Sequence, residues 1–272
     1  MIWINGQEIL FSNFPNGETK MNEDSIQQNL DEYQMAHIVF KFQEDGDLIK
    51  LMFVKKYVDT LSPYKAKLTI MYMPYSRMDR VEDSSAFTLK YVSEFINYLD
   101  FCAVNIIEPH SDVTMALVDK VKAMSMTVDI AKATLKEIGF NKDIDYIYFP
   151  DGGAEKRYSK HFKGIKTLTG FKKRDFKTGE ITSLEIIGSV DSPSRKVVMI
   201  DDLCSRGGTF KFGAQKLKSM GVGEIYLVVA HCEDTVHEGD LLSSENNLIE
   251  RIFTTNSILT KNHKKIAKLN IR

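Results

Sequence analysis

The stretch from Lys196 to Thr209 constrains the fold of this chain more than any other. It reads Lys-Val-Val-Met-Ile-Asp-Asp-Leu-Cys-Ser-Arg-Gly-Gly-Thr, so a short apolar run leads into two carboxylates and then a loop of small residues. An apolar run of this length, rich in β-branched residues, indicates a strand buried on both faces, which is typical of a parallel sheet. The glycines and the helical pattern that follow predict a strand–loop–helix junction.

The two carboxylates after this strand, Asp201 and Asp202, carry the first chemical information. Open α/β sheets place their ligands beyond the carboxyl ends of the strands, where carboxylates can accept hydrogen bonds from sugar hydroxyls or hold Mg²⁺. Gly207 and Gly208 allow backbone N–H groups to approach an anion, and Thr209 opens a helix whose amino end favours phosphate. A ribose joined to a phosphate fits this pattern, although Asp-Asp before Gly-Gly is also common loop chemistry.

The rest of the chain alternates between strand and helix patterns, which predicts an α/β protein of two doubly wound parallel-sheet domains. We expect strands at residues 67–73, 103–107, 146–149, 184–187, 197–200 and 225–230, and helices at residues 84–99 and 209–220. The expected domains are residues 1–125 and 126–272. We expect the tail from about residue 256 to return to the first domain, with residues 261–268 forming a basic, solvated helical face.

Composition excludes several kinds of partner. The 272 residues carry a net charge of −1, which argues against binding to nucleic acid or to an anionic membrane through bulk charge. The amino terminus has no secretion signal pattern, and no apolar run reaches membrane-spanning length. The three cysteines show no C-x-x-C spacing, which favours reduced thiols over a disulfide framework or a zinc site. We therefore expect a cytoplasmic protein that binds small molecules.

Charged side chains follow four of the expected strands. The loops after them are residues 75–80, 108–111, 150–157 and 201–209. Taken alone, Arg77 is a typical surface ion-pair residue and His110 a typical structural histidine. Arginines, a histidine and carboxylates gathered at the carboxyl ends of parallel strands suit a metal–nucleotide site better than a protein interface.

These loops, with one segment near the start of the chain, resemble the ribose-phosphate pyrophosphokinase family, whose members make phosphoribosyl pyrophosphate. Four segments of the chain resemble motifs of the family. Residues 14–18 resemble F-S-D-G-E, and residues 74–80 resemble P-Y-x-R-Q-D-[RK]. Residues 150–157 resemble P-D-x-G-G-x-x-R, and residues 200–209 resemble [VI]-D-D-x-x-D-T-x-G-T. Weaker similarities are residues 108–110 to D-L-H and residues 254–258 to a T-N-S-I segment. The acidic loop is also shared with type I phosphoribosyltransferases, so the resemblance implies a type I phosphoribosyltransferase-like fold.

The resemblance implies how ATP and Mg²⁺ are bound. The family's ATP-binding residues correspond to five residues here. Phe14 would stack on adenine, and Asn16 and Glu18 would bind the edge of the base. Arg77 and Asp79 would contact the rest of the nucleotide, with Arg77 on phosphate. In the family, the segment that matches residues 14–18 often serves a neighbouring subunit, which implies a homo-oligomer. His110 and Asp151 correspond to residues that help to position Mg²⁺.

The resemblance also assigns the sugar phosphate and the catalytic loop. Asp201 and Asp202 would hold the ribose hydroxyls, while the 5-phosphate would be surrounded by Ser205, Arg206, Gly207, Gly208 and Thr209. Lys172-Lys173-Arg174 falls where the family has a mobile catalytic loop. Lys172 and Arg174, together with His110, are the expected catalytic residues, because cations there can neutralise charge on the transferred group. An exposed turn between Gly170 and Gly179 is the simpler interpretation of the same stretch.

The implied reaction is transfer of the β,γ-diphosphate of ATP to the anomeric hydroxyl of a ribose, with release of AMP. The chain has no G-x-x-x-x-G-K-[ST] segment, which excludes a P-loop kinase. Two alternatives remain open. A type I phosphoribosyltransferase would consume the activated sugar, and a catalytically silent regulatory relative would only bind nucleotide.

Three departures from the family pattern bear on the substrate. Met78 replaces a glutamine, Ala154 a glycine, and Ser205-Arg206 an Asp-Thr pair. A guanidinium beside the 5-phosphate could also meet a second phosphate. The acceptor therefore remains open between ribose 5-phosphate and ADP-ribose, whose 1-pyrophosphate would belong to a route that rebuilds NAD.

The similar segments begin and end close to the ends of the chain. Phe14 lies nearer the start than in typical family members, and the chain stops soon after Ile258. We therefore expect a first strand–helix unit and a final helix to be missing. Because those pieces contribute to subunit contacts in the family, the resemblance does not extend to hexamer formation or to regulation by phosphate or ADP.

Overall fold

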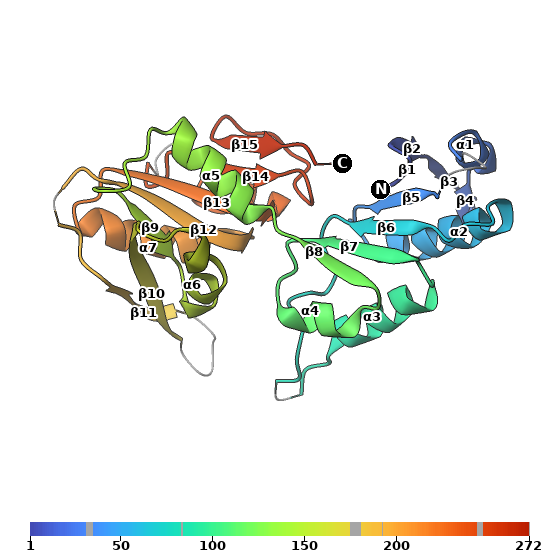
Figure 1. Ribbon diagram of the computed structural model, residues 1–272, viewed down its shortest axis with the longest axis horizontal. Helices are drawn as coiled ribbons and strands as arrows, with labels where there is room; N and C mark the ends of the chain where they lie inside the picture. Colours follow the sequence, from blue (N-terminus) through green and yellow to red (C-terminus); the bar gives the residue numbers. More distant parts are fainter. Residues whose placement is uncertain (31–34, 83, 175–180, 192, 244–246, 272) are drawn as a thin grey trace. The chain divides into compact units, whose positions relative to one another are not determined.

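The protein was analysed as a computed structural model, which describes residues 1–30, 35–82, 84–174, 181–191, 193–243 and 247–271, without the side chains of 172–174 and 181–183. The chain forms two compact units, Met1–Ser125 and Met126–Ile271 (Figure 1). Each unit is built around one main β-sheet with helices packed against it. No helix in the described ranges is long and apolar enough to cross a membrane.

Unit 1 contains a six-stranded sheet in the order β2-β1-β5-β6-β7-β8. Its strands are β1 (Ile2–Ile4), β2 (Gln7–Ile9), β5 (His37–Phe40), β6 (Lys67–Ile70), β7 (Ala103–Ile107) and β8 (Val121–Met124). Strands β5 to β8 are parallel, whereas β1 is antiparallel to both β2 and β5. The remaining elements are the hairpin β3 (Phe11–Asn13) and β4 (Thr19–Met21), and the helices α1 (Glu23–Gln28), α2 (Gly46–Leu61), α3 (Thr88–Tyr98) and α4 (Asp112–Leu117).

Apolar spacing explains how the helices of unit 1 pack. In α3 the buried residues recur three or four positions apart, at Leu89, Val92 and Ile96, which places them on one face of the helix. That face belongs to the same core as Ile38, Leu68 and other strand residues. The helix expected from residue 84 begins later, at Thr88, with Phe87 as the residue that precedes it.

Unit 2 contains a seven-stranded sheet in the order β11-β10-β9-β12-β13-β14-β15. Its strands are β9 (Tyr146–Phe149), β10 (Lys166–Arg174), β11 (Ile181–Ile187), β12 (Lys196–Cys204), β13 (Glu224–Cys232), β14 (Arg251–Thr255) and β15 (Ile266–Leu269). All neighbours pair in parallel except β10 and β11. The helices are α5 (Thr127–Glu137), α6 (Gly152–Tyr158) and α7 (Gly208–Ser219), with short 3-10 turns η1 (Ser159–His161) and η2 (Asp234–Glu238).

The central strand β12 is covered on both faces, as its continuous apolar run predicts. Val197 and Met199 pack in one core cluster with residues of α7. Val198 and Ile200 pack in a second cluster with residues of α5 and α6. Helices on both faces of a mainly parallel sheet define a doubly wound α/β unit, so the predicted fold class is confirmed.

Several predicted elements differ in detail from the structure. Strand β12 extends to Cys204, so Asp201 and Asp202 lie within it rather than after it. The tail was expected on the first domain, but β15 adds to the sheet of unit 2 and pairs with β14. Residues 261–268 accordingly contain part of a strand rather than a helix. The sequence did not predict the antiparallel strands β1 and β2 at the start of the chain. Each has only three residues, which is too short to show a strand pattern.

Candidate functional site

The acidic edge of unit 2, formed by Asp151, Asp201 and Asp202, lies at the carboxyl ends of β9 and β12. Consecutive strand residues point to opposite faces, so Asp201 continues the face of Met199, toward α7, and Asp202 the face of α5 and α6. An Arg157 Nη1 of α6 lies 3.6 Å from an Asp202 carboxylate oxygen, in agreement with this arrangement. The two side chains therefore leave the strand on different faces, yet a side-chain hydrogen bond between their carboxyl groups contributes to the raised pKa of Asp201.

Burial raises the pKa of Asp201 well above its ordinary value, and the neighbouring charges of Asp202 and Asp151 raise it further. The backbone N–H of Asp202 donates to Asp201 Oδ1 over 2.9 Å and opposes this shift. Because burial and neighbouring negative charges destabilise the ionised form of Asp201, a hydrogen-bond donor or a cation that binds with a ligand would stabilise that form strongly.

Asp151 joins this edge from the end of β9. It is the flanking residue of α6, and its Oδ1 accepts a hydrogen bond from the N–H of Ala154 over 3.0 Å. The interaction fixes the carboxylate at the start of the helix. No group of three or more His, Cys, Asp or Glu side chains in the described residues is arranged to hold a metal ion. One or two carboxylates are nevertheless the usual protein share of a Mg²⁺ site, where substrate phosphates supply other ligands.

The predicted phosphate loop, residues 205–209, overlaps the start of the 12-residue helix α7, which begins at Gly208 with Gly207 as the residue before it. Gly207 has φ +82, and a side chain there would also lie 2.3 Å from Leu241, so both conformation and space require glycine. Nothing lies within 4 Å of a side chain placed at Gly208. The N–H groups of the first helical turn are natural partners for an anion at this position.

Carboxylates from the segment after β13 line this loop. Ser205 Oγ donates to Glu233 Oε2 over 2.5 Å, and Thr235 Oγ1 donates to the same oxygen over 3.0 Å. Arg206, which was expected beside phosphate, instead forms an exposed ion pair with Glu238 at 3.0 Å. A phosphate in the loop would compete with these carboxylates for the same donors. Sequence patterns did not single out Glu233, because its contact with Ser205 joins residues 28 positions apart.

The expected adenine contacts lie in the β3–β4 hairpin of unit 1. Asn16 Nδ2 donates to Glu18 Oε2 over 2.8 Å, and the backbone N–H of Glu18 donates to Asn16 Oδ1 over 3.2 Å. Phe14 is 48% exposed, and the amine of Lys20 lies 5.9 Å from its ring centroid. The hairpin therefore presents an aromatic face with two mutually bonded polar side chains nearby.

The other nucleotide candidates of unit 1 follow β6 and β7. Arg77 is exposed, whereas Asp79 is buried and accepts a hydrogen bond from Arg80 Nε over 3.1 Å. His110 is partly buried in the loop after β7. The backbone of Tyr75 and Glu108, which begin these loops, has positive φ values of 60 and 40, a conformation that costs energy in non-glycine residues. Such strain at the ends of adjacent strands is typical of ligand-binding loops.

Lys172 and Arg174 were expected in a loop but occupy the end of β10, where they pair with Leu184 and Ile181 of β11. Their side chains lie outside the described residues, so their predicted catalytic role stays a prediction. Gly170, earlier in the same strand, approaches β9 closely. A side chain there would lie 2.4 Å from the hydroxyl of Tyr148 and 2.7 Å from the carbonyl oxygen of Pro150.

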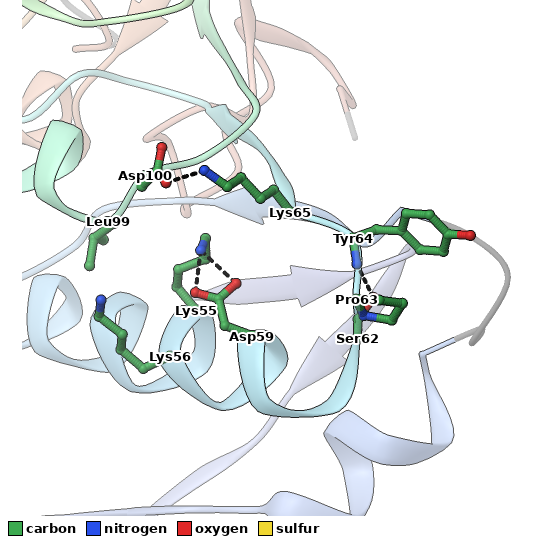
Figure 2. Close-up of a pocket in the computed structure, with 9 residues that line it drawn as sticks. All are labelled: Lys55, Lys56, Asp59, Ser62, Pro63, Tyr64, Lys65, Leu99 and Asp100. Carbon is green, nitrogen blue, oxygen red and sulfur yellow. Dashed lines mark hydrogen bonds and ion pairs between the residues drawn. The ribbon is translucent and has the colours of Figure 1, made fainter.

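A separate pocket of about 290 Å³ lies in unit 1 beside the segments that precede β6 and β7, away from the carboxyl ends of these strands (Figure 2). Its charged groups already pair with one another. The buried amine of Lys55 contacts both carboxylate oxygens of Asp59 at 2.7 and 2.5 Å, and Lys65 pairs with Asp100 (Figure 2). We interpret this pocket as a structural ion-pair cluster, distinct from the candidate site.

Comparisons with known proteins find similar sequences over most of the chain. No protein-family model matches the chain. It is 23% identical over 258 residues to the ribose-phosphate pyrophosphokinase of Sulfurisphaera tokodaii, covering 90% of this chain and 82% of that protein. It is 26% identical over 259 residues to ribose-phosphate pyrophosphokinase 2 of Enterococcus faecalis, covering 92% of this chain and 79% of that protein.

A solved structure shows the same fold. The phosphoribosylpyrophosphate synthetase of Mycobacterium smegmatis superposes with a TM-score of 0.75 at 14% sequence identity, covering 97% of this chain and 86% of that one. The sequence matches therefore extend over both units, and the fold match does so independently. The chain is a homologue of the ribose-phosphate pyrophosphokinases, a family of diphosphotransferase enzymes.

Proposed function

We propose that the protein transfers the β,γ-diphosphate of ATP to the anomeric hydroxyl of a 5-phosphorylated ribose and releases AMP. The observation that carries this proposal is the acidic edge of β12 joined to a glycine loop and a helix amino end, in a chain similar to ribose-phosphate pyrophosphokinases over 90% of its length. Carboxylates suit the sugar hydroxyls, and the first turn of α7 suits the 5-phosphate.

In this reaction the 1-hydroxyl oxygen of the ribose attacks the β-phosphorus of ATP, and the bond from that phosphorus to the oxygen bridging it to the α-phosphorus breaks. The hydroxyl proton is lost, and AMP leaves with the bridging oxygen. The protein aligns the reactants and stabilises negative charge, and no covalent intermediate with the enzyme is required. Lys172, Arg174 and His110 are the proposed catalytic residues because their side chains can supply positive charge.

Mg²⁺ is the proposed cofactor, with Asp151 and His110 as residues that help to position it. The carboxylate oxygen of Asp151 that does not cap α6 is a hard donor of the kind Mg²⁺ prefers. Bound Mg²⁺ would neutralise charge on the phosphates of ATP. Because an imidazole is a poorer Mg²⁺ ligand than a carboxylate, His110 is the weaker of these two assignments.

ATP is the proposed co-substrate of unit 1. We assign adenine stacking to Phe14, base-edge contacts to Asn16 and Glu18, and phosphate contact to Arg77. Asp79 acts through its hydrogen bond to Arg80, because it is buried. A homo-oligomer follows if the β3–β4 hairpin completes a neighbouring subunit's nucleotide site. The free thiols of Cys102, Cys204 and Cys232 support a cytoplasmic location.

The acceptor is either ribose 5-phosphate or ADP-ribose. The position of Arg206 within the predicted phosphate loop favours a second phosphate and thus ADP-ribose, whereas its ion pair with Glu238 reduces the charge available to that phosphate. We expect R206T to shift the ratio of kcat/KM toward ribose 5-phosphate. An unchanged ratio would remove Arg206 from the specificity of the enzyme.

The first test is to incubate the protein with ATP and Mg²⁺, offer either ribose 5-phosphate or ADP-ribose, and follow AMP release. AMP with either sugar supports the proposal and identifies the acceptor. A type I phosphoribosyltransferase would release no AMP, but would release diphosphate from phosphoribosyl pyrophosphate in the presence of a base. A silent relative would bind ATP and turn over neither sugar.

A further inference from the structure

The hydroxyl of Tyr148, on β9, is a buried polar group that the assignments above do not use. The side chain is fully buried, and its oxygen has no hydrogen-bond partner in the part of the chain whose side chains are described. A buried hydroxyl without a partner typically costs about 1–3 kcal/mol. Native proteins satisfy most such groups, so an exception calls for a reason.

The position of this hydroxyl connects it with the acidic edge. Tyr148 is the register neighbour of Met199, and Asp201 lies two residues further along β12 on the same face. Two strand residues span about 6.6 Å, a distance that a tyrosine side chain leaning along the strand can cover. The negative charges of Asp151 and Asp201 add to burial in raising the pKa of Tyr148, which keeps it in the protonated form that donates.

Two neighbouring positions carry glycine, and any side chain at either of them would lie too close to this hydroxyl. A side chain at Gly170 would lie 2.4 Å from this oxygen, and one at Gly213 of α7 would lie 3.1 Å from it. Two glycines on different elements therefore accommodate a tyrosine where phenylalanine would fill the same core without an unsatisfied oxygen.

We propose that Tyr148 is a positioning residue of the sugar site, whose hydroxyl donates a hydrogen bond to the carboxylate of Asp201 when that carboxylate turns to accept the hydroxyls of a bound ribose. The inference rests on the proposed function, because it requires a ribose at the acidic edge. Before binding, the Tyr148 hydroxyl has no hydrogen-bond partner among the described side chains, and Asp201 is crowded by Asp202 and Asp151. When the ribose binds, the Tyr148 hydroxyl gains an acceptor and the Asp201 carboxylate gains hydrogen-bond donors.

The test uses two tyrosines of the same strand that differ in one respect. Tyr146 points to the same face of β9 as Tyr148, but its hydroxyl accepts a hydrogen bond from the backbone N–H of Asp191 over 3.0 Å. We expect Y148F to keep or raise the Tm and to weaken binding of ribose 5-phosphate or ADP-ribose, whichever the wild type binds, by about 10-fold, as for a lost hydrogen bond to a charged group. We expect Y146F to lower the Tm by a few degrees without changing the affinity for the sugar.

Calorimetric titrations with each sugar and with ATP distinguish the outcomes. In turnover assays, the KM for the sugar should rise in Y148F while the KM for ATP stays the same, because only the ribose contact passes through Asp201. Equal sugar affinity in the wild type and Y148F would overturn the role of Tyr148 and leave the proposed function intact. A Y148F protein with a lowered Tm and a uniform loss of all activities would have the same consequence. Absence of binding of either sugar to the wild type would overturn the sugar site and the role of Tyr148 together.

Discussion

Gly239 offers a sharp test of how the phosphate loop is supported, because replacing it with alanine adds one methyl group at a defined place. Its φ of −94 and ψ of 178 are open to any residue, so backbone strain plays no part. A Cβ at this position would lie 1.9 Å from the carbonyl oxygen of Arg206 and 3.0 Å from its carbonyl carbon. Both are backbone atoms of the loop, so a rotamer change cannot relieve the clash.

The cost follows from these distances. A carbon in contact with a carbonyl oxygen sits at about 3.3 Å, so the two segments must separate by about 1.4 Å in G239A. Overpacking of this kind costs about 1–3 kcal/mol. For a unit of this size, about 2 kcal/mol corresponds to a Tm lowered by about 4–8 °C. The shift would also move Ser205 and Arg206 away from Glu233 and Glu238, so affinity for the sugar phosphate should fall.

Differential scanning calorimetry and titration with ribose 5-phosphate or ADP-ribose, whichever the wild type binds, check this prediction. Gly208→Ala is the matched control for stability, because nothing lies within 4 Å of its added methyl group and alanine favours the helix that begins there. We expect G208A to keep or raise the Tm. A G239A protein with a Tm within about 1 °C of the wild type and unchanged affinity would refute the tight packing of residues 233–239 against the loop.

Three further predictions concern charge. Asp201→Asn should abolish AMP release while keeping or raising the Tm in thermal unfolding, because burial and two neighbouring carboxylates already oppose its charge. Asp59→Asn should destabilise the protein more than Lys55→Met in urea unfolding, by about 2 kcal/mol, because D59N leaves a buried amine unpaired whereas K55M leaves a carboxylate that is 34% exposed. In Asp47 burial alone would raise the pKa, but the hydrogen bond from Lys50, the N-terminal ammonium and backbone N–H groups lower it below the ordinary 3.8. This stabilisation is therefore present above pH 3.8 and is lost as the pH falls through the lowered pKa. Asp47→Asn should cost about 1–2 kcal/mol at pH 7, and the difference from the wild type should narrow only as the pH falls below 3.8.

The sequence predicted the features that depend on local patterns. The apolar run before Asp201 indicated a strand covered on both faces, and Gly207 and Gly208 indicated the loop before α7. The structure has both, because strand burial and positive φ values leave direct signatures in residue type. The ordered motifs also led to the family that the comparisons found.

The sequence could not predict features that depend on pairing between distant segments. The tail was expected on unit 1, but β15 pairs with β14 at the edge of the unit 2 sheet. The residue pattern of a four-residue strand does not predict which strand it pairs with. Extension of β12 through Asp201 and Asp202 likewise depends on its ladder with β13, which continues to Cys204 and Cys232. Within this ladder the two side chains leave the strand in opposite directions, while a hydrogen bond still joins their carboxyl groups.

The sequence by itself thus determined the fold class, the position of the carboxylates at the end of a buried strand and the glycine loop after them, because each follows from burial, turn chemistry and residue order along a short segment. Only the tertiary structure decided which side chains meet at that edge. It showed that Ser205 contacts Glu233, that Arg206 pairs with Glu238, and that the hydroxyl of Tyr148 is buried without a described partner. The two pairs join residues 28 and 32 positions apart, and sheet register and helix packing set such contacts rather than any local pattern.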